Sequence, residues 1–387
     1  MKNLIFLTIF NLTLFSDTLK LKETLNIVLE KNPEIKSLYE KLKEKGSRIL
    51  PSFTLPNPRI TFREMFTEEN ISIMQEIPLP TKLITEGLMA KDEYKMEFYL
   101  YQAKILEIIR ELKENFFEYY FINKKIEITK NQVEILSKMI EITERKYESG
   151  SASLYEVLKS QIELEKMKNE ISLFESEKIK IRENLKKLFN TEEIPEITEE
   201  VIFEEIKINE DSLIKILYEK NPLLKAMEFD VKAKNKEKIL SYQNLIPDPM
   251  PEVLYNTKTG EKKIALSFEI PLFFREFYEI KEKNAKLKSS KWELLNKKLE
   301  LKKELYSLIS LYKSKLERLK IFKEKILPKA EESFISAEAG YISGKLDFLF
   351  YLESEKMLYE SKIDYFMILT ELLKIKSKIE EITGGEL

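Results

Sequence analysis

The sequence of 387 residues consists of two similar halves, and this duplication limits the possible folds more than any other feature. The pattern Tyr-x-Ser-Gly occurs at residues 147–150 and again at 341–344, 194 residues later. Four ordered matches at a nearly constant offset indicate an internal repeat. The three other landmarks are 189, 191 and 193 residues apart: Asn-Pro (32–33, 221–222), a proline-rich link (51–58, 247–251) and Ile-Pro-Leu (77–79, 270–272).

Each half predicts the same order of elements. The first half, residues 17–190, begins with a helix over 22–48 that breaks or restarts at Asn32-Pro33, because Asn before Pro is typical of a helix cap. Strands at 58–66 and 70–79, a helix at 81–148, a tip at 149–153 and a helix at 154–190 follow. The second half, residues 211–387, predicts helices at 211–244, 273–342 and 347–382 and strands at 252–256 and 262–270. Residues 191–210 form the predicted linker.

The longest predicted helices are rods. At 1.5 Å per residue, the helices over 81–148 and 273–342 are each roughly 100 Å long. The two shorter helices of each half, laid end to end, match that length. An apolar stripe lines the second rod at steps of three and four, and we expect it to be buried packing. It contains Trp292, Leu295, Leu299, Leu305, Leu308, Tyr312, Leu316, Leu319, Phe322 and Ile326. We also expect Pro328 to kink or loosen this helix.

The predicted strand at 262–270 alternates apolar and polar residues well, which gives it one apolar face. The strands at 58–66 and 70–79 alternate except at Glu64 and Gln75, and the strand at 252–256 is too short to score. The predicted strands are nearly as long as a membrane-spanning strand, which needs about 9–11 residues. Two interpretations stay open: membrane hairpins, or hairpins packed on a soluble helical domain. The apolar positions are Ile60 and Phe62, Ile71 and Ile73, and Ile264, Leu266, Phe268 and Ile270.

Four strands cannot close a membrane barrel, because small barrels begin at about eight strands. Open edges in lipid would leave backbone groups without hydrogen-bond partners. If the hairpins lie in a membrane, several copies of the chain must therefore share one barrel. Three copies would supply twelve strands.

The composition excludes several functional classes. The chain has no cysteine and no histidine, so zinc sites of the usual ligands, thiol nucleophiles and Ser-His-Asp triads cannot form. It has no Gly-x4-Gly-Lys-Ser/Thr phosphate loop and no Gly-x-Gly-x-x-Gly turn. Its 65 basic and 67 acidic residues nearly balance, so no basic field would gather nucleic acid. We expect neither an enzyme nor a cofactor or metal site.

Residues 1–16 predict an export signal. Lys2 precedes an apolar run from Leu4 to Phe15, which is too short to span a membrane as a helix but suits the core of a signal peptide. Ser16 would precede the cleavage site, although Leu14 is larger than the residue usual there. A buried first helix is the alternative.

In this order and duplicated, the landmarks resemble those of the outer-membrane efflux protein family, the TolC-like outer membrane factors. The residues that carry the resemblance are the two Asn-Pro breaks, the Glu-Ile-Pro-Leu strand exits (76–79, 269–272) and the two Tyr-x-x-Gly tips. The resemblance implies a homotrimer with a periplasmic tunnel of helices, an α-barrel, and a shared 12-stranded β-barrel in outer-membrane lipid. It implies a passive exit duct whose partners are a periplasmic adaptor (a membrane fusion protein) and an inner-membrane pump.

The resemblance also implies where such a duct narrows. Two acidic positions after the second tip correspond here to Phe350 and Glu353, so the ring at the pore entrance would be partly hydrophobic. Leu346 replaces a basic tip residue that helps lock the closed state in relatives, and Glu156 matches its acidic partner, so we expect that lock to be absent. A solvated helix face is the alternative for Glu156 and Glu353. The tips that would dock the adaptor comprise Tyr147, Ser149, Gly150, Tyr341, Ser343, Gly344 and Leu346.

The expected fold is therefore mainly α with a small β part: long antiparallel coiled-coil hairpins that form an α-barrel, and two β-hairpins that contribute to a trimeric 12-stranded membrane barrel. The expected function is an outer-membrane exit channel of a tripartite efflux or secretion system. The lipid-facing positions would be the eight apolar strand residues named above. The alternative is a periplasmic or soluble coiled-coil scaffold or adaptor. The sequence does not identify the cargo.

Overall fold

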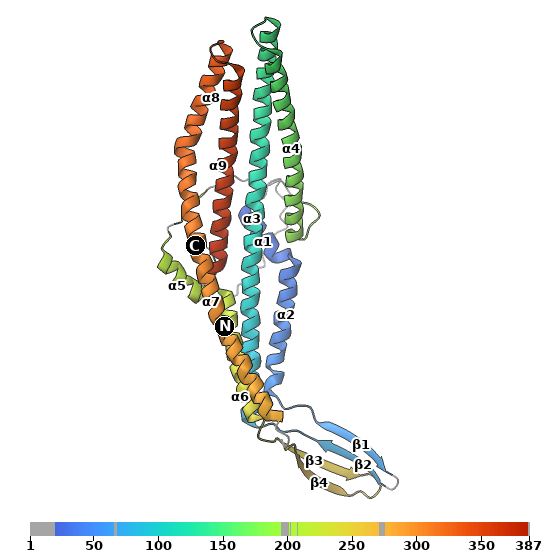
Figure 1. Ribbon diagram of the computed structural model, residues 1–387. Coiled ribbons are helices and arrows are strands. Elements are labelled where there is room, and N and C mark those ends of the chain that lie inside the picture. Colours follow the sequence, from blue (N-terminus) through green and yellow to red (C-terminus); the bar gives the residue numbers. More distant parts are fainter. Residues whose placement is uncertain are drawn as a thin grey trace.

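The computed structural model describes residues 20–65, 68–194, 201, 203–206, 208–270 and 275–385. The predicted signal at 1–16, part of the predicted linker and the second strand exit at Pro271-Leu272 lie outside the described residues. The chain is elongated: helices run along its length, both Ser-Gly tips lie at one end, and the sheet projects from the other (Figure 1).

The two halves contain the same elements. The first comprises α1 (Leu21–Lys31), α2 (Pro33–Ile49), a 3-10 turn (Pro51–Phe53), β1 (Arg59–Met65), β2 (Glu68–Met74), α3 (Pro80–Glu148) and α4 (Leu154–Phe189). The second comprises α5 (Glu210–Lys220), α6 (Pro222–Gln243), β3 (Pro249–Asn256), β4 (Lys262–Phe268), α7 (Arg275–Ile321), a π-helical segment (Phe322–Ile326), α8 (Leu327–Ile342) and α9 (Phe348–Thr383). The predicted order of elements is confirmed. The helices predicted over 211–244 and 273–342 are each interrupted, at Asn221 and at Phe322–Ile326, because Pro222 and Pro328 cannot continue regular helical bonding.

The Asn-Pro breaks explain how short helices are stacked end to end. The Asn32 side chain accepts hydrogen bonds from the backbone N–H groups of Glu34 and Ile35, and so caps α2. Its Nδ2 donates to the Leu188 carbonyl at the end of α4, at 3.1 Å. The second half repeats the arrangement, since Asn221 caps α6 and donates to the Ile382 carbonyl at the end of α9, at 2.8 Å. One buried amide in each half thus joins two short helices into a column beside a long one.

Burial follows the repeat closely. Residues 193 apart on α3 and α7 are buried alike, and they lie in the same central core: Leu112 and Leu305, Phe116 and Ile309, Tyr119 and Tyr312. Beyond the π-helical segment the matching offset becomes 194, as for the buried pair Leu136 and Ala330. A π turn accommodates one extra residue in a helix. The segment therefore absorbs the single residue by which the two rods differ.

Pro328 lies just after this segment, and the predicted local loosening of the helix is confirmed. Proline has no backbone N–H to donate to the carbonyl of the preceding turn, so regular α-helical bonding cannot continue through it. The α-helix resumes at Leu327, with Pro328 in its first turn, where a missing N–H costs little.

The apolar stripe on the second rod is only partly buried in the chain. Leu305, Tyr312 and Leu319 lie in the core, as expected. For Trp292 and Leu299 the expectation of burial within one chain is wrong: these side chains are 69% and 59% exposed. The cause is that α3 packs against both α2 and α6, whereas within the described residues α7 packs against α6 and has no helix in the place that α2 takes on α3.

The sheet is antiparallel throughout, in the order β1-β2-β3-β4. The strand bounds differ from prediction chiefly in β3, which begins at Pro249 and so includes part of the predicted link over 247–251. The carbonyls of Pro251 and Pro249 accept hydrogen bonds from the N–H groups of Gln75 and Ile77, at 3.1 and 3.0 Å. These positions use their carbonyls as acceptors, so prolines with extended backbones can occupy them. β4 ends at Phe268 rather than at residue 270.

Candidate functional site

The pairing register of the sheet sorts its side chains into an apolar and a polar face. Directly paired residues of antiparallel strands project to the same side. Ile60, Ile73, Val253 and Ile264 are paired in one row across all four strands. Neighbouring rows pair Phe62 with Ile71 and Tyr255, Pro251 with Leu266, and Pro249 with Phe268. The opposite face is mostly polar, with Arg59, Thr61, Arg63, Asn70, Ser72 and Lys263, but it also includes Met74, Met250 and Leu254.

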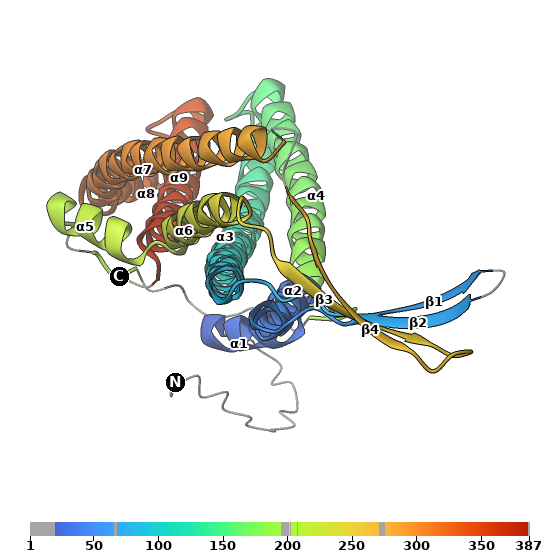
Figure 2. The same cartoon turned by 90° about the horizontal axis from the view of Figure 1, so that it is seen from below.

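The chain leaves the apolar face uncovered. Figure 2 shows the sheet extending sideways from the helices. Phe62 is 75% exposed and Ile264 is 84% exposed, and Ile270 beyond the end of β4 is exposed as well. A contiguous exposed apolar surface of this kind marks contact with a membrane or a partner. The eight strand residues predicted to face lipid therefore lie on, or directly beside, one apolar surface; their contact with lipid stays a prediction.

The described helices include none that is long and apolar enough to cross a membrane.

At the other end of the molecule, both tips have the same backbone geometry. Gly150 and Gly344 have φ of 77° and 74°, a left-handed conformation that glycine adopts without strain. The Ser151 N–H donates to the Lys146 carbonyl, and the Lys345 N–H donates to the Gly340 carbonyl, at 2.7 and 2.8 Å. The two predicted turns are confirmed as closed helix ends. Ser149 and Ser343 each lie at the C-cap.

The two tip tyrosines have different surroundings. Tyr147 is 45% exposed, whereas Tyr341 is 3% exposed. The Tyr341 hydroxyl lies 2.9 Å from Thr143 Oγ1 on α3, and its ring packs against Phe348 and Tyr351. Burial raises the pKa of Tyr341, and the nearby Glu156 carboxylate adds to that rise.

Lys146 joins the first tip to the second. Its ammonium donates a hydrogen bond to the Tyr341 carbonyl, and Nζ lies 3.9 Å from the centroid of the Tyr341 ring. Sequence reasoning did not identify this contact, because nothing in the local pattern pairs residues 195 apart. Leu346 packs on Gly340, where a Cβ would meet its Cδ1 at 2.5 Å. The expected absence of the closed-state lock stays a prediction, and the basic group at this tip is Lys146 of the other tip.

The predicted pore-entrance residues follow the second tip on α9. Phe350 and Glu353 are three residues apart and both exposed, so they lie on one uncovered side of the helix. Glu156 is half-buried at the start of α4, where the Ser153 hydroxyl donates to its carboxylate at 3.3 Å. Facing a pore stays a prediction for all three residues.

A buried polar pair lies behind this surface, between α3 and α9. Gln132 donates from Nε2 to Glu355 Oε1, and Glu355 is only 1% exposed. Glu355 Oε2 and the Tyr351 hydroxyl are buried without a hydrogen-bond partner within the described part of the chain. Burial is the main cause that raises the pKa of Glu355, the Gln132 hydrogen bond opposes the rise and repulsion from Glu163 adds to it, and the resulting pKa is about 7. The prediction missed this pair, although a Gln and a Glu at core positions of two apolar stripes are a usable signal.

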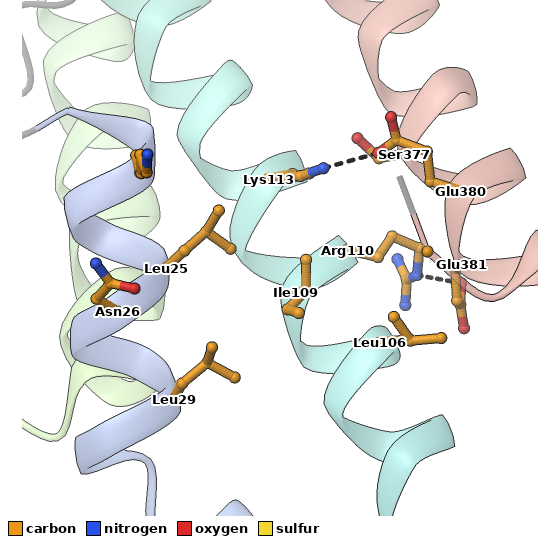
Figure 3. Close-up of a pocket in the computed structure, with 12 residues that line it drawn as sticks. Leu25, Asn26, Leu29, Leu106, Ile109, Arg110, Lys113, Ser377, Glu380 and Glu381 are labelled. Atoms are coloured by element: carbon orange, nitrogen blue, oxygen red, sulfur yellow. Dashed lines mark hydrogen bonds and ion pairs between the residues drawn. The ribbon is translucent and has the colours of Figure 1, made fainter. Parts of the chain in front are cut away.

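A groove of about 390 Å³ lies at the middle of the molecule, between α1, α3 and α9 (Figure 3). Leu25 and Leu29 form one side of it. On the other side Lys113 Nζ lies 2.7 Å from Glu380 Oε2, and Arg110 Nε lies 2.8 Å from Glu381 Oε2. Both carboxylates are thus neutralised by cations of the same chain, which is an arrangement for joining helices rather than for acid–base chemistry.

Comparison with known proteins agrees with this geometry. The model of the outer membrane efflux protein family matches residues 72–191. A search of curated proteins found no match. The outer-membrane channel OprN is similar in structure, with a TM-score of 0.84 and 14% identity over 94% of this chain and 90% of that one. So are the CmeC outer membrane channel of Campylobacter jejuni (TM-score 0.82, 14% identity, 97% and 90% covered) and the outer membrane protein VceC of Vibrio cholerae (0.80, 13%, 95% and 96%).

These findings confirm two predictions. The resemblance to outer-membrane efflux proteins is confirmed by the family match and by the structural neighbours. The fold class, mainly helical with a small antiparallel sheet, is confirmed by structures that cover almost the whole chain. The neighbours are described as channels or as outer membrane proteins.

Proposed function

We propose that this chain, which has the fold and part of the sequence signature of outer membrane efflux proteins, is the outer-membrane exit duct of a tripartite efflux or secretion system. Its sheet would lie in the outer membrane and its helices in the periplasm. The observation that carries the proposal is the uncovered apolar face of the sheet, with Phe62 and Ile264 among its most exposed residues. A membrane barrel needs an apolar outer face and a polar inner face, as this register provides.

The helices support assembly into a closed ring. Leu154, Leu158 and Ile162 form an exposed apolar face on α4, and Ile335 and Ile342 form another on α8. Two different faces that need covering favour head-to-tail contact between copies, which closes into a ring when the rotation allows. A homotrimer would combine the strands of three chains into a barrel of twelve. Twelve strands are compatible with known membrane barrels, whereas the four strands described in one chain are too few to close a barrel.

The tips support contact with further partners. Tyr147 and Phe350 present exposed aromatic surface at the end farthest from the sheet. A periplasmic adaptor that docks there would connect the duct to an inner-membrane pump, which supplies the energy. The duct itself would be passive. A periplasmic or soluble scaffold remains the second candidate, but it gives no reason for an apolar sheet face exposed to water.

Reconstitution into planar bilayers tests the proposal. Purified protein in detergent should run as a trimer and should form discrete, long-lived channels after insertion. A monodisperse monomer that stays in solution without detergent would instead favour the scaffold. The quadruple variant Phe62→Ser, Ile73→Ser, Ile264→Ser and Leu266→Ser should abolish insertion into the membrane. A variant of exposed helix residues, Lys138→Ser with Lys356→Ser, should retain it.

A further inference from the structure

The sheet has two free edges that require a partner. Within the described residues β1 and β4 each pair with a single neighbouring strand. If the sheet lies in lipid, as the proposed function requires, both outer edges must be paired, because no water is present to satisfy their backbone groups. The residues that meet across the gap between two copies can be derived from the internal repeat.

Backbone hydrogen bonds identify which residues point outward. Gln75 and Ile77 donate to β3, and the Glu69 carbonyl accepts from Thr257, so the odd-numbered residues of β2 face β3. Bonding direction alternates along an antiparallel strand. With the observed registers, the even-numbered residues of β1 and of β4 therefore point away from their neighbours. These include Phe62 on β1 and Leu266 on β4.

The contact between β2 and β3 is a template for the missing contact. It is the place where the first repeat meets the second, and Ile73 pairs there with Val253. Ile73 corresponds to Leu266 at the 193-residue offset of the strand exits, and Val253 corresponds to Phe62 at the 191-residue offset of the proline links. The same contact between copies therefore places Leu266 opposite Phe62 of the partner subunit.

The chemistry of the two edges agrees with this register. Leu266 and Phe62 both point outward and both lie on the apolar face, like the template pair. A shift by one residue would place Leu266 opposite Thr61 or Arg63 and would mix the two faces. A shift by two residues keeps the faces together, so the repeat offsets decide between those registers, and an experiment can check them.

The helices next to the sheet can be compared in the same way, with a contact between α3 and α6 as the template for a contact of α7 with a second copy. Inside the chain, Tyr99 of α3 stacks on Phe229 of α6 at 5.6 Å, and Lys225 Nζ lies 5.5 Å from the Tyr99 ring centroid. Tyr99 corresponds to the exposed Trp292 at an offset of 193, and Lys225 corresponds to Lys36 in the Asn-Pro-x-x-Lys landmark. The missing second helix on α7 would then be α2 of a second copy.

We propose that β4 pairs antiparallel with β1 of a second copy, with Leu266 opposite Phe62 of the partner subunit, and that Trp292 lies against Lys36 of the partner subunit. The junction of the two repeats inside one chain is thereby repeated at the junction between chains. The proposal specifies a register that trimer formation alone does not.

Cysteine cross-linking tests the register directly, because the chain has no cysteine of its own. The double variant Phe62→Cys with Leu266→Cys should form disulfides between chains under mild oxidation, giving dimer and trimer bands on a non-reducing gel. The matched control, Ile73→Cys with Val253→Cys, should form a disulfide within one chain and run as a monomer. The register-shifted variants Ile60→Cys with Leu266→Cys and Glu64→Cys with Leu266→Cys should cross-link at least tenfold less.

Trp292→Cys with Lys36→Cys provides a second readout. A short bismaleimide should join its chains, while Tyr99→Cys with Lys225→Cys should react only within a chain. Native gels and bilayer currents on the same samples separate the two levels of the argument. Suppose that the samples form trimers and channels, but that a register-shifted variant cross-links more strongly or that cysteines at 62 and 266 form no disulfide. Either result overturns the register alone. Absence of trimers and channels in the unmodified chain overturns the proposed function.

Discussion

Lys82 Nζ lies 2.7 Å from Asp248 Oδ2 and 2.7 Å from the Ile246 carbonyl, and Lys82 is almost fully buried. The other Asp248 oxygen accepts the Leu79 N–H at 3.1 Å. These bonds join the start of α3 to the link that precedes β3. The first half is thereby fixed to the second at the point where the sheet leaves the helices.

Lys82→Met should destabilise the fold by about 3–5 kcal/mol, because it leaves the Asp248 carboxylate without its cation in a largely buried site. Asp248→Asn should cost less than Lys82→Met, since the amide oxygen can still accept the Leu79 N–H. Urea unfolding in detergent, followed by circular dichroism, measures the free energies.

The control for this prediction is Lys43→Met, because Lys43 Nζ lies 2.8 Å from Glu40 in a solvent-exposed pair. Exposed pairs of this kind contribute little, so its unfolding curve should overlay that of the unmodified protein. Equal effects of Lys82→Met and Lys43→Met would show that the junction does not depend on the buried pair.

Lys146→Met should loosen the second tip. The substitution removes a charged donor from the Tyr341 carbonyl and a cation from the face of its ring. Cation–π contacts contribute about 0.5–2 kcal/mol. Hydrogen–deuterium exchange of residues 339–346 should become several-fold faster, and channels in planar bilayers should open more often.

Lys146→Arg should recover part of the protection, because it keeps the cation at the tip. Lys138→Met is the matched control, since Lys138 is an exposed lysine of the same helix that pairs with Glu134 at 2.8 Å. If hydrogen–deuterium exchange at residues 339–346 is as slow in Lys146→Met as in Lys138→Met, the contact between Lys146 and Tyr341 does not stabilise the second tip.

The Gln132–Glu355 pair should make stability depend on pH. The pKa of Glu355 in the folded chain is about 7, above its ordinary value of 4.5, so the folded chain binds more protons than the unfolded chain between those pH values. The contribution of protonated Glu355 to the free energy of unfolding is fully present below pH 4.5 and is lost as pH rises through about 7. This contribution amounts to about 3 kcal/mol, at 1.36 kcal/mol for each unit of pKa difference.

Glu355→Gln should remove this dependence, because a neutral amide stays uncharged across the range. Melting temperatures at pH 5 and pH 8 should then differ less than in the unmodified chain. Repulsion from Glu163 on α4 makes a small contribution to the raised pKa of Glu355, so Glu163→Gln should lower that pKa slightly and should leave most of the dependence intact. A variant Glu355→Gln with the original pH dependence would assign the effect to other groups.

Much of the fold could be read from the sequence because its signals are local and occur twice. Asn32 and Asn221 each precede a proline, and a cap of that kind depends on neighbouring residues alone. The alternation of β4 is similarly local. The start of β3 was misjudged because Pro249 and Pro251 read as a link, while in the sheet they supply carbonyls to β2. That role depends on the strand beside them.

The candidate site was less predictable than the fold. Both tip glycines follow from the turn that each must make, but the contact between Lys146 and Tyr341 joins residues far apart in the sequence. Burial of Glu355 likewise depends on α3 packing against α9. The exposure of Trp292 has a related cause, because its repeat equivalent Tyr99 is covered by a helix that α7 lacks within one chain.

The exposed side of α9 next to the second tip gives the last prediction. Glu353 is exposed on that side with Phe350 one turn before it. In a trimer of the proposed kind, three Glu353 carboxylates would ring the narrow entrance and favour cations. Glu353→Ala should therefore lower cation selectivity, measured as a reversal potential in asymmetric KCl, and should change the single-channel conductance. Phe350→Asp should act in the opposite direction, since it adds a second ring of charge. Glu360→Ala, on the same helix but farther from the tip, is the control. Currents that are identical for Glu353→Ala and the unmodified channel would place Glu353 outside the pore and leave it as a solvated residue of α9.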